Sequence, residues 1–155
     1  MEGTGTTKRQ TDTRIPVGPR ADGPRRVLVV DDEAGVCMLV RRILSGAGYE
    51  VLEAEDGRAA MHVLLDHAPT LSLVVSDLVM PVMSGHDLAD FLRRYFPDIP
   101  LIMMSAYSAE AIRERFGLLA PEAPFLRKPF MPDDMLRAVR AVLGDEVTGA
   151  EVERS

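Results

Sequence analysis

The stretch from Leu71 to Gly85, LSLVVSDLVMPVMSG, constrains the fold of this chain more than any other. Its first half is a short apolar, β-branched run that carries Ser76 and Asp77, and such a run is typical of a strand buried on both faces of a parallel sheet. Pro81 and Gly85 then indicate a turn. The pattern predicts that Asp77 lies at the carboxyl end of a central strand, where it either caps the next turn or faces a ligand.

Four further apolar runs alternate with amphipathic segments along the chain. The other strands are expected over 27–30, 50–54, 100–104 and 125–127. Helices are expected before Gly46, between Gly57 and Pro69, before Pro97, around 109–116, and from near Pro132 to the residue before Gly144. Strands and helices that alternate in this way form a parallel sheet covered on both faces, with right-handed crossovers. We therefore predict an α/β, flavodoxin-like doubly wound fold with a five-stranded parallel sheet, strand order 2-1-3-4-5, and five helices.

The composition predicts one folded domain with short tails. The chain has 155 residues, of which 46% are hydrophobic and 27% charged, and this is enough to bury a substantial core. Residues 1–24 are rich in Gly, Thr, Pro and charge without periodicity, so we expect a flexible tail there. The domain is expected over residues 25–144, followed by a short acidic tail over 145–155.

Charge and cysteine content exclude several classes of protein. A net charge of −6 argues against a nucleic-acid-binding surface, which is normally basic. The single cysteine, Cys37, cannot form an internal disulfide, which fits a reducing compartment. The sequence also lacks an apolar run long enough to span a bilayer and the apolar core of a signal peptide. We expect a cytoplasmic chain without a direct nucleic-acid or membrane partner.

Polar side chains follow four of the predicted strands. Asp31 and Asp32 follow the first strand, Asp77 ends the third, Ser105 follows the fourth and Lys128 follows the fifth. Each has an ordinary explanation alone: Asp32 or Glu33 as a helix cap, Ser105 as a strand end, Lys128 as a solvated lysine. Ligands of doubly wound sheets bind at the carboxyl ends of the strands. We therefore expect these side chains to form one site.

The chemistry of this cluster points to a cation and to phosphoryl transfer. Two like unit charges ~4 Å apart repel by about 4 kcal/mol at an effective dielectric constant of roughly 20, so neighbouring carboxylates need a cation or protons between them. Hard oxygen ligands without His or Cys favour Mg²⁺. A carboxylate beside Mg²⁺, a lysine and a hydroxyl is well suited to accept a phosphoryl group, because the positive charges neutralise the transferring oxygens.

Four motifs at these positions resemble the receiver domain of bacterial two-component response regulators, the CheY-like family. They are VLVVDDE at 27–33, SDLVMPVMSG at 76–85, MMSAY at 103–107 and FLRKPF at 125–130, in the family's order. The resemblance extends from about Arg25 to Leu143. It implies a phosphoacceptor that takes a phosphoryl group from the phosphohistidine of a sensor histidine kinase or histidine phosphotransfer domain. It also implies that the chain is no enzyme beyond its own phosphorylation and slow dephosphorylation.

The resemblance implies a role for each matching residue around the acceptor. Asp77 would be the phosphoacceptor. Asp32 would bind Mg²⁺ directly, Asp31 would act mainly through bound water, and the backbone carbonyl of Val79 would complete the metal ligands together with Asp77. Lys128 would contact the phosphoryl oxygens.

The resemblance also implies a switch. Ser105 would contact the phosphoryl oxygens, and Phe125 occupies the aromatic position whose rotamer reports on phosphorylation in this family. The bond between Lys128 and Pro129 would be cis, which costs little before proline. Met131 stands where relatives often have Ser or Thr, so we expect the last helix to lack a side-chain cap.

Other functions remain as alternatives. The segment FLRKPFMPDDMLRAVRAVL near the end of the sequence resembles receivers that end hybrid sensor histidine kinases, which is the main alternative. An aspartyl-nucleophile phosphatase of the haloacid dehalogenase type would need Asp-x-Asp after the first strand and a cap insertion, whereas the sequence has Asp31-Asp32-Glu33. A dinucleotide-binding domain would need glycines there. Because few residues follow the last predicted helix, we expect no DNA-binding output domain within this chain. A homodimer is possible, and the downstream partner is unknown.

Overall fold

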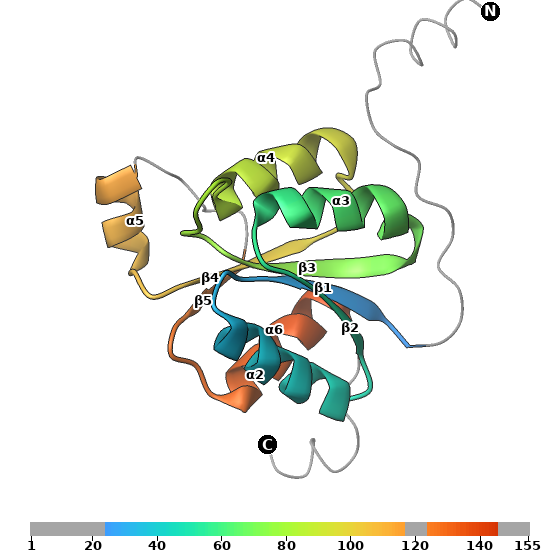
Figure 1. Cartoon of the computed structure of the whole chain (residues 1–155). Coiled ribbons are helices and arrows are strands. Elements are labelled where there is room, and N and C mark those ends of the chain that lie inside the picture. The colour runs from blue at the N-terminus through green and yellow to red at the C-terminus, as the bar shows by residue number, and fades with distance from the viewer. Residues whose placement is uncertain (1–23, 117–123, 146–155) are drawn as a thin grey trace, which may run out of the picture.

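The computed structural model describes residues 24–116 and 124–145 (Figure 1). The tails expected over 1–24 and 145–155 fall outside the described residues, except for Pro24 and Asp145. Asp145 contacts the domain: its carboxylate accepts a hydrogen bond from the Tyr49 hydroxyl at 2.9 Å and pairs with Arg25 at 2.9 Å. None of the helices in the described part has the length and apolarity to cross a bilayer.

Strands and helices alternate as the apolar pattern predicts. The strands are β1 (Arg26–Val30), β2 (Glu50–Ala54), β3 (Leu71–Asp77), β4 (Leu101–Ser105) and β5 (Phe125–Arg127). The helices are α2 (Ala34–Gly46), α3 (Gly57–His67), α4 (Gly85–Tyr95), α5 (Ala109–Phe116) and α6 (Pro132–Leu143), and a short 3₁₀ helix, η1 (Ala68–Thr70), follows α3. β4 lies one residue later than expected, because its last residue, Ser105, pairs with Arg127 of β5.

The five strands form one parallel sheet in the order β2-β1-β3-β4-β5, which confirms the predicted topology. The helices α3 and α4 cover one face and α2 and α6 cover the other, while α5 lies at the end of the sheet beside β4 and β5 (Figure 1). β3 is central, and every residue of this strand is buried. The carboxyl ends of the parallel strands therefore meet at one edge, with the end of β3 in the middle.

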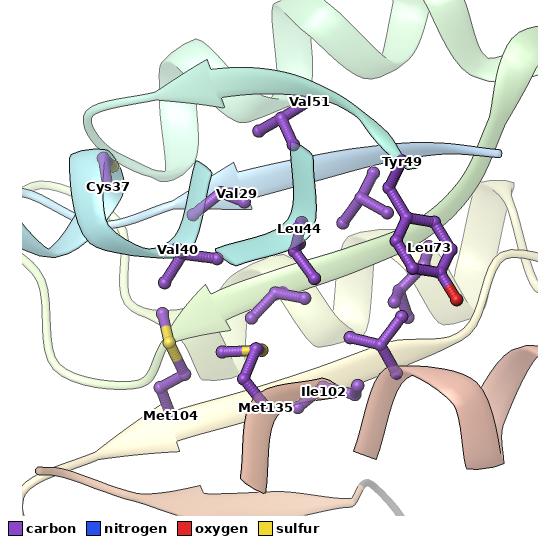
Figure 2. Packing of buried hydrophobic residues seen from close by; sticks show 13 residues of the cluster. Val29, Cys37, Val40, Leu44, Tyr49, Val51, Leu73, Ile102, Met104 and Met135 are labelled. Carbon is purple, nitrogen blue, oxygen red and sulfur yellow. The ribbon is translucent and has the colours of Figure 1, made fainter. Parts of the chain in front are cut away.

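Side chains that alternate along each strand fill two cores. Along β1, Val27 and Val29 point to the face covered by α2 and α6, whereas Leu28 and Val30 point to the face covered by α3 and α4. Figure 2 shows the first core, in which Val29 lies among side chains from both helices and neighbouring strands. Burying one such aliphatic side chain contributes roughly 1.5–3 kcal/mol, so the two cores hold the sheet rigid under its carboxyl edge.

Some polar side chains cap the starts of helices and so take no part in the site. Ser84 caps α4, accepting a hydrogen bond from the Asp87 N–H at 3.1 Å, and Asp56 caps α3 through the Ala59 N–H at 2.8 Å. Neither Asp32 nor Glu33 caps α2: Glu33 stands at the N-cap without a side-chain cap bond. Met131 likewise supplies no side-chain cap to α6, as expected.

The loop between β3 and α4 approaches the end of β3 closely. A Cβ atom on Gly85 would lie 2.3 Å from the backbone oxygen of Asp77 and 2.8 Å from the Cα of Leu78. Only glycine fits there, and its N–H donates to the Leu78 oxygen at 2.8 Å. Val82, in the same loop, has a φ of 71°, a strained value for a β-branched residue. The loop is thus closely fitted beside Asp77.

Candidate functional site

Three carboxylates meet at the carboxyl edge of the sheet. Asp31 and Asp32 directly follow β1, and Asp77 is the last residue of β3. One carboxylate oxygen from each lies within 4.8 Å of the others. Asp31 and Asp77 are buried and Asp32 is exposed, so the cluster opens to solvent on the side of Asp32. The structure therefore brings together the three carboxylates that the strand ends predicted.

Lys128 joins this cluster from the end of β5. Its Nζ donates to Asp31 Oδ2 at 2.8 Å and to Glu33 Oε1 at 3.3 Å, and lies 3.4 Å from Asp77 Oδ1. The lysine side chain is 14% exposed, so these contacts are largely shielded from water. The peptide bond between Lys128 and Pro129 is cis, as expected. One ammonium therefore serves three carboxylates.

Asp31 is held by donors on both of its oxygens. Oδ1 accepts from the Glu33 N–H at 2.9 Å, and Oδ2 accepts from Lys128. Its side chain has no exposed surface, and its backbone oxygen accepts a hydrogen bond from Cys37 Sγ at 3.4 Å. Burial and the neighbouring Asp31 raise the pKa of the Cys37 thiol to about 11, so this cysteine stays protonated. Asp31 is thus fixed, whereas Asp32 remains exposed.

The charges of the cluster shift the pKa of both Asp77 and Lys128. Burial, reinforced by the charge of Asp31 and only partly offset by Lys128, raises the pKa of Asp77 to about 6. Burial alone would lower the pKa of Lys128, but the hydrogen bond to Asp31 and the charge of Asp77 outweigh it and raise this pKa above its ordinary value. Lys128 is therefore charged at neutral pH. Asp77 is mostly ionised at that pH, although burial and the charge of Asp31 disfavour its ionised form.

Ser105 is the last residue of β4, and its side chain is turned towards the loop that follows. The residue is buried, and its Oγ accepts a hydrogen bond from the Tyr107 N–H at 3.0 Å. The Lys128 N–H donates to the Ser105 backbone oxygen at 2.8 Å, which ties the ends of β4 and β5 together. Ser105 is thus adjacent to the lysine, and its hydroxyl has a backbone partner in the loop before α5.

Phe125 and Val79 are the other two residues that the sequence predicted for the site. Phe125 is half-buried on β5 and packs against a small core of Leu78, Met103 and Ile112, on the side of α5. Val79 is 38% exposed in the loop after β3. The expected metal contact of its carbonyl stays a prediction.

Glu33 is the residue that the sequence pattern assigned only to helix capping. The structure instead places its carboxylate on Lys128 and its N–H on Asp31. The sequence signal for this contact was the acidic run Asp31-Asp32-Glu33 after β1. A third acid at the end of a strand can face the site instead of capping the next helix.

The donor set of this edge fits a magnesium ion. Asp31, Asp32 and Asp77 offer carboxylate oxygens close enough to share one ion, and hard oxygen ligands suit Mg²⁺. A divalent cation would also relieve the repulsion that raises the pKa of Asp77.

Residues 27–140 match the family described as the response regulator receiver domain. The chain belongs to this family. It is 37% identical over 121 residues to the response regulator MprA of Mycolicibacterium vanbaalenii, covering 77% of this chain and 51% of MprA. It is also 37% identical to the phosphate regulon transcriptional regulatory protein PhoB of Pseudomonas aeruginosa, covering 77% and 52%. The receiver chain thus spans about half the length of these curated relatives.

Solved receiver structures share the fold. The chemotaxis response regulator CheY4 of Vibrio cholerae is 30% identical, with a TM-score of 0.68 over 77% of this chain and 99% of CheY4. The response regulator TrrA of Thermotoga maritima, solved in complex with Mg²⁺-BeF, is 31% identical, with a TM-score of 0.67 over 77% and 99%. The receiver domain of the hybrid histidine kinase CckA is 32% identical, with a TM-score of 0.64 over 76% and 98%.

These relatives bear on the expected partners. PhoB is named a transcriptional regulator, so the expectation of no nucleic-acid partner has no support from the comparisons.

Proposed function

We propose that this receiver accepts a phosphoryl group on Asp77 and changes its surface in response. The observation that carries the proposal is the contact geometry of Asp77. It ends the central strand, its Oδ1 lies 3.4 Å from Lys128 Nζ, and its oxygens lie within reach of the Asp31 and Asp32 carboxylates. A carboxylate with an ammonium on one side and a cation site on the other is equipped to attack phosphorus.

The proposed reaction is a single displacement. A carboxylate oxygen of Asp77 forms a bond to phosphorus while the N–P bond of the donor phosphohistidine breaks, and the ring nitrogen keeps the electron pair. The donor is a sensor histidine kinase or a histidine phosphotransfer domain. Lys128 stabilises the charge of the transferring oxygens. Because the pKa of Asp77 is about 6, the nucleophilic carboxylate predominates at neutral pH.

Mg²⁺ would be held by Asp32 directly, by Asp31 mainly through water, by Asp77 and by the Val79 carbonyl. When bound, Mg²⁺ supplies positive charge that stabilises the phosphoryl oxygens in the transition state. The arrangement of Asp31 supports its indirect role, because Lys128 and the Glu33 N–H already occupy its two oxygens.

The proposed switch runs through Ser105. Its hydroxyl turns from the Tyr107 N–H towards the phosphoryl oxygens, and Phe125 follows into the space behind it. The small core that joins Phe125 to Ile112 of α5 supports this route, because a rotation of Phe125 removes contacts from that helix.

The receiver acts in the cytoplasm as the regulatory part of a larger signalling response. It is no enzyme beyond its own phosphorylation and the slow hydrolysis of its phosphoryl group. The curated relatives are about twice as long as the region they share with this chain, which supports a regulator whose output lies outside the receiver. The second candidate is a receiver of a hybrid sensor histidine kinase, and the likeness to the CckA receiver favours it.

Incubation with acetyl phosphate and Mg²⁺, followed by intact mass measurement, tests the proposal. The wild type should gain one phosphoryl group, and Asp77→Asn should gain none. Asp66→Asn, which changes an exposed acid near the end of α3, is the matched control and should react like the wild type. A wild-type protein that gains no mass would overturn the proposal.

A further inference from the structure

We propose that Glu33 is a positioning residue that restrains Lys128 and thereby slows phosphoryl acceptance by Asp77. The inference deepens the proposed function and rests on it. It starts from the three carboxylates around one ammonium: Asp31 at 2.8 Å, Glu33 at 3.3 Å and Asp77 at 3.4 Å from Nζ.

The ammonium of Lys128 donates to two carboxylates and forms an ion pair with a third. A lysine offers three N–H donors, and three carboxylates surround this one. A phosphoryl oxygen arriving at Asp77 therefore takes a donor from one of them. Asp31 is buried and holds the shortest contact, and Asp77 carries the incoming group itself. Glu33, whose side chain is 64% exposed, is the partner that Lys128 can leave most easily.

The local structure directs Glu33 towards Lys128. Glu33 occupies the N-cap of α2, where the shorter side chains of Ser, Thr, Asp or Asn ordinarily accept from the first helical N–H groups, and the longer Glu33 side chain makes no such bond. Its N–H is instead fixed on Asp31 Oδ1 at 2.9 Å. The residue thus contacts the site at two points, and its carboxylate reaches Lys128 across 95 positions of sequence.

The consequence is a restraint on the reaction. Lys128 must move its donor from Glu33 to a phosphoryl oxygen as the transition state forms. An exposed ion pair of this kind is weak, so releasing it should change the rate by about 2–5-fold rather than by orders of magnitude. A restraint on Lys128 acts on the maximal rate. Simple repulsion between Glu33 and an anionic donor would act instead on the concentration of donor needed for half-maximal rate.

Three variants separate the contact from the charge. Glu33→Gln removes the charge and most of the attraction for Lys128. Glu33→Asp keeps the charge, but the shorter carboxylate at an N-cap is suited to accept from the α2 amides and so leaves Lys128. Glu55→Gln is the matched control, because Glu55 directly follows β2 at the same edge and is also exposed.

The experiment follows phosphorylation of Asp77 with Mg²⁺ over a range of acetyl phosphate concentrations. In this reaction the oxygen–phosphorus bond of acetyl phosphate breaks, the new bond forms to Asp77, and acetate leaves with the electron pair. We expect Glu33→Gln and Glu33→Asp both to raise the maximal rate about 2–5-fold, with the half-saturating concentration unchanged. Glu55→Gln should stay within the scatter of the wild type.

Three results would overturn the inference while leaving the proposed function intact. The maximal rate of Glu33→Gln could equal that of the wild type or fall below it, Glu55→Gln could accelerate equally, or only the half-saturating concentration could change. If the wild type itself gained no phosphoryl group on Asp77, the proposed function would fail first.

Discussion

Lys128 donates to Asp31 at 2.8 Å and so links the ends of β5 and β1 across the two strands between them. The Asp31 side chain has no exposed surface and the Lys128 side chain has 14%. The pair is therefore part of the domain's structure as well as of its site, because a buried carboxylate left without its partner is strongly destabilising.

A double-mutant cycle tests this pair in the metal-free protein. Lys128→Ala should lower the free energy of unfolding by about 1–3 kcal/mol, somewhat less than for a fully buried pair. Adding Asp31→Asn should recover part of the loss, since the amide carries no charge to leave unpaired. Urea unfolding of the four proteins measures the coupling. Additive effects would show that the two side chains do not stabilise each other.

The pKa of Asp77 predicts how stability changes with pH. The folded pKa is about 6 and the ordinary value is 3.8, so the folded state holds a proton that the unfolded state releases between these values. The free energy of unfolding should therefore fall as pH rises from about 4 to about 6, and stay lower above it.

Asp77→Asn removes this penalty. At neutral pH without metal, the free energy of unfolding of the variant should be about 1–2 kcal/mol higher than that of the wild type, after allowance for solvent screening. The difference should shrink as the pH falls and vanish below about pH 3, where Asp77 is protonated in both the folded and the unfolded state. Thermal melts across this pH range measure it, and a difference that is the same at every pH would point to packing instead.

Magnesium should stabilise the folded domain, because the ion binds a carboxylate cluster that exists only in the folded state. The midpoint of thermal unfolding should rise with millimolar Mg²⁺. Asp32→Asn should reduce this rise more than Asp31→Asn, since Asp32 is exposed to the ion whereas Asp31 is engaged by Lys128 and Glu33. A melting temperature indifferent to Mg²⁺ would contradict the proposed metal site.

Ser105→Ala should separate phosphoryl acceptance from the response. The variant keeps Asp77, Lys128 and the acid cluster, so it should still accept the group. It loses the hydroxyl that accepts from the Tyr107 N–H at 3.0 Å. In the proposed switch, a single hydrogen bond of this hydroxyl to the phosphoryl group drives the change. Amide chemical shifts with beryllofluoride should change less around Phe125 and α5 than in the wild type. A full wild-type response would show that coupling runs elsewhere.

The sequence predicted the fold well because its signals are local. Apolar runs and their periodicity located all five strands, and the apolar run before Asp77 indicated the central one. The shared edge of a parallel sheet then placed Asp31, Asp77 and Lys128 together. The absence of a side-chain cap at Met131 followed from its residue type, once the resemblance had placed it at the start of the last helix.

The remaining features depend on contacts between distant parts of the chain. The contact of Glu33 with Lys128 joins residues 95 positions apart, and nothing in the acidic run specifies which acid turns to the lysine. The raised pKa of Asp77 depends on burial and on the Asp31 charge, which only the folded sheet creates. The close approach of Gly85 to the Asp77 backbone likewise follows from the path of the loop.

Borohydride reduction of the phosphorylated protein tests the central claim most directly. An aspartyl phosphate is a mixed anhydride, and hydride reduces it to an alcohol, so the modified aspartate becomes homoserine while an unmodified carboxylate does not react. After acetyl phosphate and Mg²⁺, peptide sequencing by mass spectrometry should find homoserine at position 77 of the wild type, and none in Asp77→Asn. Homoserine at position 31 or 32, or none at position 77 of a phosphorylated wild type, would contradict the assignment of Asp77 as the acceptor.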